Sequence, residues 1–147
     1  MKLKAKDRYE AGVVIPALNP TEALVELVER LLLLSNRDIK IGRLAILIIN
    51  DGSNIKQCET IFNILRKKEN VFIIKNKNNL GKGASLKVGI NFFKNNASFI
   101  VTADSDGQHS ADDVLKVLKT SMIEKRVTIG VRDFFGKKVP IKSRIGN

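Results

Sequence analysis

Two carboxylates one residue apart are the first candidates for chemistry in this sequence. Asp104 and Asp106 stand in the segment Asp-Ser-Asp-Gly-Gln-His, directly after a short apolar run. Such a pair is self-repelling unless a cation lies beside it, and carboxylate oxygens suit Mg²⁺ or Mn²⁺. Because Mg²⁺ commonly uses one or two carboxylates plus phosphates, the pair predicts a metal site that also binds a phosphorylated ligand. Gln108 is a candidate third oxygen donor, and a turn with helix-capping acids is the alternative.

Two glycine-bearing segments also follow apolar runs. Asp51, before Gly52 and Ser53, can accept hydrogen bonds from a base or ribose, or it can form a cap or Asx-turn before a helix. The segment 79–83 (Asn-Leu-Gly-Lys-Gly) is similar to a phosphate cradle, with Lys82 able to reach a diphosphate. It is not a Walker sequence, because glycine follows the lysine, and its glycines also suit a tight turn into a helix.

Histidine and cysteine each occur once, which limits other chemistry. A histidine-based zinc site or a Ser-His-Asp triad would depend on His109 alone, so a supporting role beside the acidic cluster and a place at the start of a helix both remain open. Cys58 excludes an internal disulfide and a multi-cysteine metal site, and it fits a reducing compartment.

These polar segments alternate with elements that can position them. Short apolar runs rich in β-branched residues predict buried strands at Ala11–Ile15, Leu44–Ile49, Val71–Ile74, Ser98–Thr102 and Val127–Val131. Amphipathic segments predict helices that begin at Asn19-Pro20, at about Asn54, at about Lys82 and after Ser110. We therefore expect an α/β fold, with a doubly wound, mostly parallel sheet and helices on both faces.

In such a sheet, ligands bind beyond the carboxyl ends of the strands. The segments 16–20, 50–53, 79–83 and 104–109 each follow a predicted strand, so we expect them to meet at one rim around a single pocket.

Bulk composition sets the remaining limits. The 147 residues are 44% apolar and predict one domain over 1–147. A net charge of +11, with basic clusters near both termini, predicts anionic partners and makes a nucleic-acid-binding domain the non-enzymatic alternative. Aromatic residues make up only 5%, however, and offer no clear stacking platform. No apolar run is long enough for a signal peptide or a membrane span, and 133–147 reads as a loop leaving the sheet.

The motifs together resemble those of the family-two glycosyltransferases of GT-A fold, and more narrowly the dolichyl-phosphate mannose synthase and polyprenyl-phosphate hexose transferase branch. The matching segments are Val-Val-Ile-Pro-Ala-Leu-Asn at 13–19, Ile-Asn-Asp-Gly-Ser at 49–53, Asn-Leu-Gly-Lys-Gly at 79–83, Ala-Asp-Ser-Asp-Gly-Gln-His at 103–109 and Gly-Val-Arg-Asp-Phe at 130–134. Their order and spacing cover nearly the whole chain.

This resemblance implies an inverting, metal-dependent transfer of a hexose from a UDP- or GDP-sugar to a polyprenyl phosphate or a cell-envelope glycan. The nucleoside would lie against Pro16, Ala17, Asn19 and Asp51, while Asp104, Asp106 and Gln108 would hold Mg²⁺ or Mn²⁺ and the diphosphate. Arg132, in the Gly-x-Arg segment, would face the donor diphosphate or the acceptor phosphate, with Arg144 as a weaker candidate.

The sequence departs from the family pattern at three places. Leu18-Asn19-Pro20 replaces the usual Tyr-Asn-Glu, Asn50 replaces the first of two aspartates, and Ser105 replaces an alanine. Members also continue past the Gly-x-Arg segment into acceptor-binding and membrane-anchoring parts, so we expect this chain to be a fragment of a cytoplasmic enzyme that works at the inner face of the membrane. A sugar-phosphate nucleotidyltransferase is the alternative enzyme, but it would need glycine and arginine in the first loop, and 16–20 has neither.

Overall fold

The computed structural model describes residues 8–131, in which strands and helices alternate four times. The strands are β1 (Tyr9–Ala17), β2 (Leu44–Asn50), β3 (Val71–Lys75) and β4 (Ala97–Thr102). The helices are α1 (Glu22–Arg37), α2 (Lys56–Arg66), α3 (Lys82–Phe93) and α4 (Ala111–Glu124). The first four predicted strands and all four predicted helices are confirmed, with shifts of a few residues at their ends.

The four strands form one parallel sheet in the order β3-β2-β1-β4. β1 pairs with β2 on one side, from Ala11 opposite Leu44 to Ala17 opposite Asn50, and with β4 on the other side. Every residue of β2 is buried, because side chains on both faces of this strand are covered. The chain moves outward from β1 to β3 and then returns to β4, and this reversal opens a crevice at the carboxyl ends of β1 and β4.

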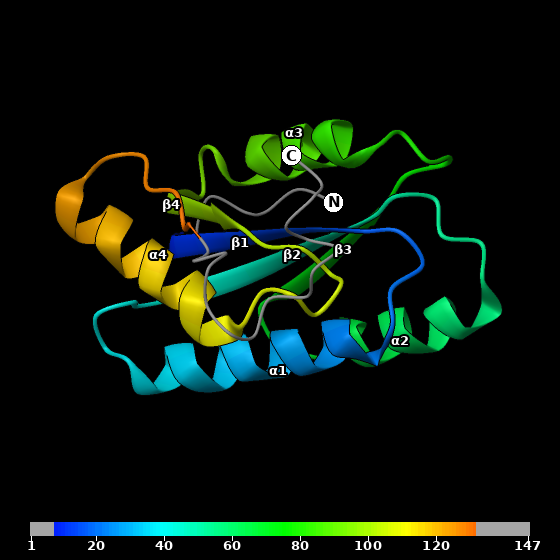
Figure 1. Cartoon of the computed structure of the whole chain (residues 1–147), viewed down its shortest axis with the longest axis horizontal. Helices are drawn as coiled ribbons and strands as arrows, with labels where there is room; N and C mark the ends of the chain where they lie inside the picture. Colours follow the sequence, from blue (N-terminus) through cyan, green and yellow to red (C-terminus); the bar gives the residue numbers. More distant parts are fainter. Residues whose placement is uncertain (1–7, 132–147) are drawn as a thin grey trace.

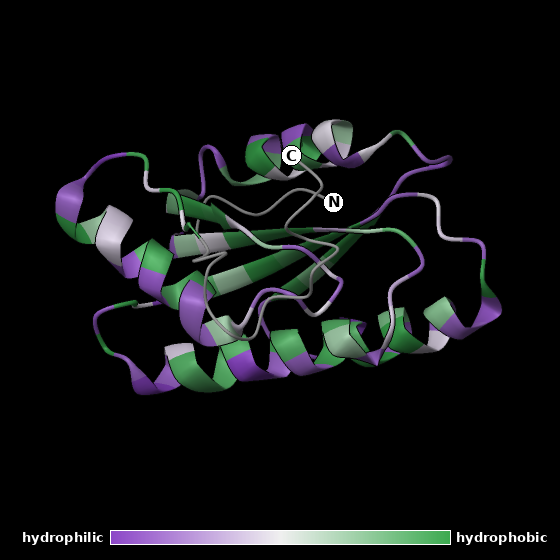
Figure 2. Cartoon of the chain, in the orientation of Figure 1, coloured by the Kyte–Doolittle hydropathy of each residue, from purple (hydrophilic) through white to green (hydrophobic). Residues whose placement is uncertain are grey.

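The helices cover both faces of the sheet unequally (Figure 1). Helices α1, α2 and α4 lie on one face and enclose the larger core, which includes Leu31, Phe62 and Leu118. In the part of the chain that the structure describes, α3 lies alone on the other face, over a smaller core that includes Leu47 and Phe93. The ribbons of the helices alternate between hydrophobic and hydrophilic residues along their length, whereas the strands between them are mostly hydrophobic (Figure 2). The predicted doubly wound fold is confirmed.

Two glycines let α3 lie close to β1. Gly12 on the strand faces the ring of Phe93 on the helix, and a methyl group at position 12 would come within 2.6 Å of that ring. Gly89 on the helix likewise faces Val14 on the strand, with no room for a side chain. Each glycine therefore packs against a larger side chain of the opposite element, and this packing fixes how α3 lies on the sheet.

The first helix begins later than the sequence predicted. Thr21 is the N-cap of α1, whereas the prediction placed the cap at Asn19. Asn19 instead has a positive φ of 47°, and its side-chain oxygen accepts a hydrogen bond from the backbone N–H of Asn54. Because this side chain is used to join two loops, it does not cap the helix.

The predicted strand at Val127–Val131 is wrong. These residues follow α4 without regular secondary structure and pair with no strand among residues 8–131. The side chains of Val127, Ile129 and Val131 are 90%, 81% and 86% exposed. The β-branched composition favours a strand, but a strand also requires a neighbouring strand for its hydrogen bonds. Within the same residues, no helix has the length and apolar character needed to cross a bilayer.

Candidate functional site

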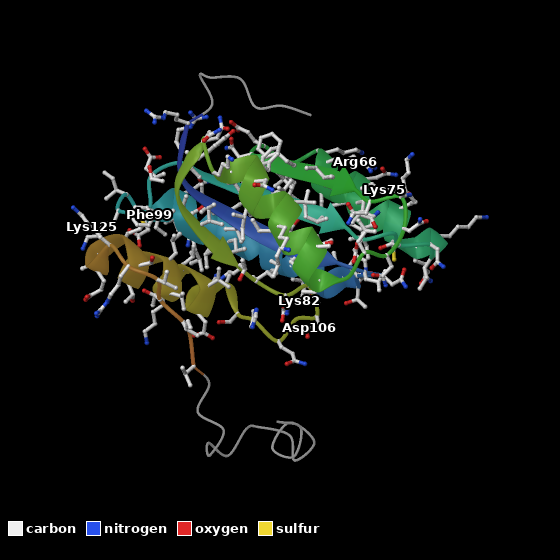
Figure 3. All side chains as sticks on the ribbon, turned by 90° about the horizontal axis from the view of Figure 1, so that it is seen from above. Arg66, Lys75, Lys82, Phe99, Asp106 and Lys125 are labelled. Atoms are coloured by element: carbon white, nitrogen blue, oxygen red, sulfur yellow. The ribbon has the colours of Figure 1, made fainter. Side chains whose placement is uncertain are left out.

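The loops that follow the four strands meet at one edge of the sheet, around a hollow of ≈ 390 Å³. Its lining comes from all four loops: Pro16, Ala17, Leu18, Asp51, Asn79, Gly81, Lys82, Asp104, Ser105 and Asp106. Figure 3 shows Lys82 and Asp106 next to each other at this edge. The predicted convergence of the loops on one pocket is confirmed.

Asp51 is buried beneath the pocket and holds the loop between β3 and α3. Its Oδ1 accepts hydrogen bonds from the backbone N–H of Leu80 at 3.0 Å and from Asn76 Nδ2 at 2.7 Å. Its Oδ2 accepts one from the backbone N–H of Gly81 at 2.9 Å. Asn76 Nδ2 also lies 3.2 Å from the hydroxyl of Ser85 in α3. This carboxylate therefore joins the ends of β2 and β3 to the first turn of α3.

The pKa of Asp51 reflects two opposing effects. Burial acts to raise it, because a carboxylate loses favourable hydration. Hydrogen bonds from Leu80, Asn76, Ser85 and Gly81 stabilise the ionised form and together outweigh burial, so the pKa of Asp51 lies below the ordinary value of an aspartate side chain. Asp51 is therefore ionised at neutral pH.

The loop after β2 is packed against both of its neighbours. Gly52 has a φ of 81°, and a methyl group there would come within 2.6 Å of the backbone at Asn78 and Asn79. On the other side, the N–H of Asn19 donates to the hydroxyl of Ser53 at 2.9 Å. The backbone N–H of Ser53 in turn donates to the side-chain oxygen of Asn50 at 2.8 Å. These contacts give the loops after β1, β2 and β3 fixed positions relative to one another.

The acidic loop after β4 is held from within and from α3. His109 Nδ1 accepts a hydrogen bond from the backbone N–H of Asp104 at 2.9 Å, and Asp106 Oδ1 accepts one from the backbone N–H of Gln108 at 2.9 Å. Across the pocket, Lys82 Nζ forms an ion pair with Asp104 Oδ1 at 2.6 Å. Ser110 caps α4, as predicted, by accepting a hydrogen bond from Asp113. The loop thus presents one half-buried and one exposed carboxylate.

These two carboxylates fit a divalent cation that takes its remaining ligands from a bound phosphate or water. Asp104 contacts Lys82 through Oδ1, and Asp106 accepts the hydrogen bond from Gln108 through Oδ1, so the Oδ2 atom of each side chain is left for a cation. Within residues 8–131 no third His, Cys, Asp or Glu joins them in a metal-binding group. A pair of carboxylates is the number that Mg²⁺ commonly takes from a protein when phosphates supply other ligands.

The predicted site residues divide into three groups. Pro16, Ala17, Asp51, Lys82, Asp104 and Asp106 line the pocket. Asn19 and Gln108 belong to the loops after β1 and β4, but they are not among the residues that line the pocket. Arg132 and Arg144 lie outside the described residues. Sequence reasoning missed Asn76 and Ser85, whose only signal was that they are polar residues beside a predicted strand and within a predicted helix.

A second hollow, of ≈ 370 Å³, lies between α1, the loop after it and α4. No residue of the four loops after the strands lines it. Its two carboxylates, Asp38 and Asp112, are ion-paired with Lys119 and Arg30. The hollow of ≈ 390 Å³ is therefore favoured as the functional site, because the four loops that carry the sequence motifs line it.

Comparison with known proteins gives a family match over almost the whole chain. The family model described as glycosyl transferase family 2 matches residues 12–146. An uncharacterized protein of Methanocaldococcus jannaschii is 34% identical over 148 residues, which cover 96% of this chain and 55% of that protein. A dolichyl-phosphate beta-glucosyltransferase of Trichomonas vaginalis is 30% identical over 105 residues, or 69% of this chain and 32% of that enzyme.

Among solved structures, the crystal structure of residues 1–349 of S. aureus TarS superimposes with a TM-score of 0.62 at 20% identity. The match covers 89% of this chain and 38% of that one, and it supports the fold. The chain spans about half the length of the first relative and about a third of the second.

Proposed function

Because this chain belongs to glycosyl transferase family 2, we propose that it forms the nucleotide-sugar-binding part of an inverting, metal-dependent hexosyltransferase. The observation that carries this proposal is the single pocket lined by Asp51, Lys82 and the Asp104/Asp106 pair. These residues come from loops far apart in the sequence, and their convergence gives one place with groups suited to a nucleoside, a diphosphate and a metal ion.

The nucleoside would occupy the side of the pocket formed by Pro16, Ala17 and the loop that carries Asp51. Both oxygens of Asp51 already accept hydrogen bonds from the chain, and Oδ1 accepts two. A carboxylate oxygen accepts about two hydrogen bonds, so Oδ2 has capacity for one more. We therefore propose that Asp51 acts on the nucleoside mainly by fixing the shape of this wall.

The diphosphate would lie between the first turn of α3 and the acidic loop. The N-cap of α3 is Gly81, which has no side chain to cap the helix, so the first N–H groups of α3 can donate to phosphate oxygens. Lys82 stands at the same place and adds a positive charge. Mg²⁺ or Mn²⁺ held by Asp104 and Asp106, with Gln108 as a further candidate ligand, would stabilise the negative charge on the departing diphosphate.

In the proposed transfer, an acceptor oxygen forms a bond to the anomeric carbon while the bond from that carbon to the diphosphate breaks, and the configuration inverts. A lipid phosphate is already ionised at neutral pH, so no side chain has to remove a proton. The chain then contributes by positioning the donor and by stabilising charge. Arg132, beyond the described residues, remains the candidate for facing the donor or acceptor phosphate.

We propose a polyprenyl phosphate as the acceptor class, supported by the similarity to a dolichyl-phosphate beta-glucosyltransferase; a cell-envelope glycan is the alternative acceptor. The proposed location is the cytoplasm at the inner face of the membrane, where such a lipid would meet a nucleotide donor. The 1–147 chain is proposed to act as one domain in this role.

Isothermal titration calorimetry with UDP and GDP, each with and without Mg²⁺ or Mn²⁺, tests the proposal. We expect binding that requires the metal, and we expect Asp104→Ala and Asp106→Ala each to abolish the metal dependence. Asp112→Ala, which removes an exposed carboxylate of α4, is the matched control and should bind like the parent protein. Unchanged metal-dependent binding in either acidic-loop variant would remove the metal assignment.

A further inference from the structure

The part of the chain that contains α3 is positively charged and has no acidic residue. Between Glu69 and Asp104 there is no Asp or Glu, while five lysines occur, at positions 75, 77, 82, 87 and 94. This stretch includes β3, α3 and β4. Its positive charge is therefore not offset by acids of the same segment.

The lysines of α3 lie along its outer side. Lys87, Ile90 and Lys94 follow the three- and four-residue spacing of one helix face, and all three are exposed, with Ile90 at 44%. Lys82 lies at the start of the helix, beside the pocket, and Figure 3 looks onto this side of the molecule. Lys75 does not belong to this surface, because its amine pairs with Glu59 of α2.

Apolar side chains accompany these charges. Leu80, just before α3, is 60% exposed. Among residues 8–131 only α3 covers this face of the sheet, so Phe72 of β3 and Phe92 of α3 are only partly buried, with ring centroids 5.7 Å apart. We call the surface formed by Leu80, Lys82, Lys87, Ile90 and Lys94, with Phe72 and Phe92 at its flank, the α3 face.

The opposite side of the molecule has mixed charge. Its helices carry both signs, and several cations there are neutralised by nearby carboxylates: Arg30 by Asp112, Lys68 by Glu29 and Lys119 by Asp38. On the α3 face Lys82 is paired with Asp104, whereas Lys87 and Lys94 lie in a segment without acids, so these two lysines contribute most of the attraction of this face for an anionic surface.

We infer that the α3 face is a docking surface for an anionic lipid membrane. Lysines near an anionic bilayer are attracted to its lipid headgroups, and exposed apolar side chains between them can enter the headgroup layer. A nucleic acid fits this surface less well, since no aromatic side chain is among the exposed large apolar residues of the described chain. Docking would bring the mouth of the pocket, beside Lys82 and Leu80, to the level of the headgroups. The inference does not depend on the metal or donor assignment.

The test is co-sedimentation of the whole chain, at low salt, with vesicles of phosphatidylcholine alone and of equal parts phosphatidylcholine and phosphatidylglycerol. The test variant combines Lys87→Glu with Lys94→Glu. The matched control combines Lys67→Glu with Lys116→Glu, which makes the same change of charge at exposed positions at the end of α2 and on α4. Lys82 is left intact because it belongs to the proposed donor site.

We expect the parent chain to bind only the anionic vesicles, and the α3-face variant to bind them at least about tenfold more weakly. The control variant should bind the anionic vesicles about as strongly as the parent. Ile90→Ser should also bind them more weakly than the parent, and the difference should grow as salt is raised, because salt screens the lysines and leaves the apolar contact. Absence of binding by the parent, or equal losses in the two charge-reversed variants, would overturn the inference. So would an α3-face variant that loses affinity for duplex DNA but not for vesicles. Because that variant should still bind UDP or GDP like the parent, failure of docking and failure of the proposed function are distinguishable.

Discussion

Lys82 and Asp104 face each other across the pocket as an ion pair, with 2.6 Å between Nζ and Oδ1. The lysine comes from the first turn of α3 and the aspartate from the loop after β4, so the pair joins the two sides of the proposed diphosphate site. A metal ion that binds Asp104 has to compete with this internal cation.

Replacing Lys82 with alanine should therefore change two affinities in opposite directions. Without the lysine, Mn²⁺ alone should bind a few-fold more tightly, by up to about tenfold, a modest gain because the lysine side chain is largely exposed. UDP or GDP with metal should bind more weakly, since a cation facing the diphosphate is lost. Calorimetry measures both, with Lys87→Ala as the control on the same helix. A parallel loss of both affinities would show that the lysine does not compete with the metal.

Asp51→Asn should destabilise the fold. The amide group cannot accept hydrogen bonds at both of its atoms, so at least one of the donors from Asn76, Leu80 and Gly81 loses its partner. Leaving such buried groups unpaired should lower the free energy of unfolding by about 2 kcal/mol or more. Urea denaturation measures this loss. Asp112→Asn, at an exposed ion pair, should change stability by less than about 1 kcal/mol.

The stability of the fold should also depend on pH through Asp51. Because the folded-state pKa of Asp51 lies below the ordinary value of an aspartate, its contribution to stability is fully present above that ordinary value and is lost as pH falls through the lower folded-state pKa. Asp38 has a pKa lowered by hydrogen bonds from Lys119 and from the backbone of Lys40, and it contributes in the same direction. Urea midpoints measured from about pH 6 to about pH 2 should fall less steeply in Asp51→Asn than in the parent.

Two glycines at the pocket should respond differently to alanine. Gly52 and Gly81 both have positive φ values, of 81° and 87°, which should cost an alanine about 1–3 kcal/mol at either position. At Gly52 the methyl group would also collide with the backbone at Asn78 and Asn79, whereas at Gly81 it would meet no atom of residues 8–131 within 4 Å. Gly52→Ala should therefore lose clearly more thermal stability, and nucleotide affinity as well. Equal effects would contradict the tight packing of these loops.

A second glycine pair lies within α3. Gly83→Ala should stabilise the protein by about 0.5–1 kcal/mol, because the position is open and alanine is the better helix former. Gly89→Ala should destabilise it by about 1–3 kcal/mol, because its methyl group would overlap Val14 of β1. Thermal unfolding of the two variants gives the comparison, and stabilisation by both would show that α3 can move away from the sheet.

The elements of the fold were predictable because their signals are local. The apolar run at Leu44–Ile49 and the Ser110 cap each specify their own structure. Val127–Val131 has the same kind of composition as a strand, but its pairing depends on a neighbour that composition does not reveal. The packing of Gly12 against Phe93 and of Gly89 against Val14 likewise depends on how two distant elements meet.

The candidate site was predictable in its position more than in its internal contacts. That Asp51 and Lys82 share a pocket follows from the rule that parallel strands end at one edge. The role of Asp51 does not, since its partners Asn76, Leu80 and Gly81 belong to the next strand and loop, and their amides have no sequence signature. The side chain of Asn19 was assigned to a helix cap for the same reason, because its actual partner, Asn54, is brought near only by the fold.

The place of β4 next to β1 has a kinetic consequence. Tyr9 pairs with Ala97, so this contact closes a chain segment that contains the other two strands and three helices. Closing such a long loop has a large entropic cost, and we expect it to come late in folding. Until it happens, Asp104 and Asp106 are separated from the wall built by β1 and β2. A nucleotide would then bind only to completely folded molecules. Its binding would therefore oppose the separation of β4 from the sheet.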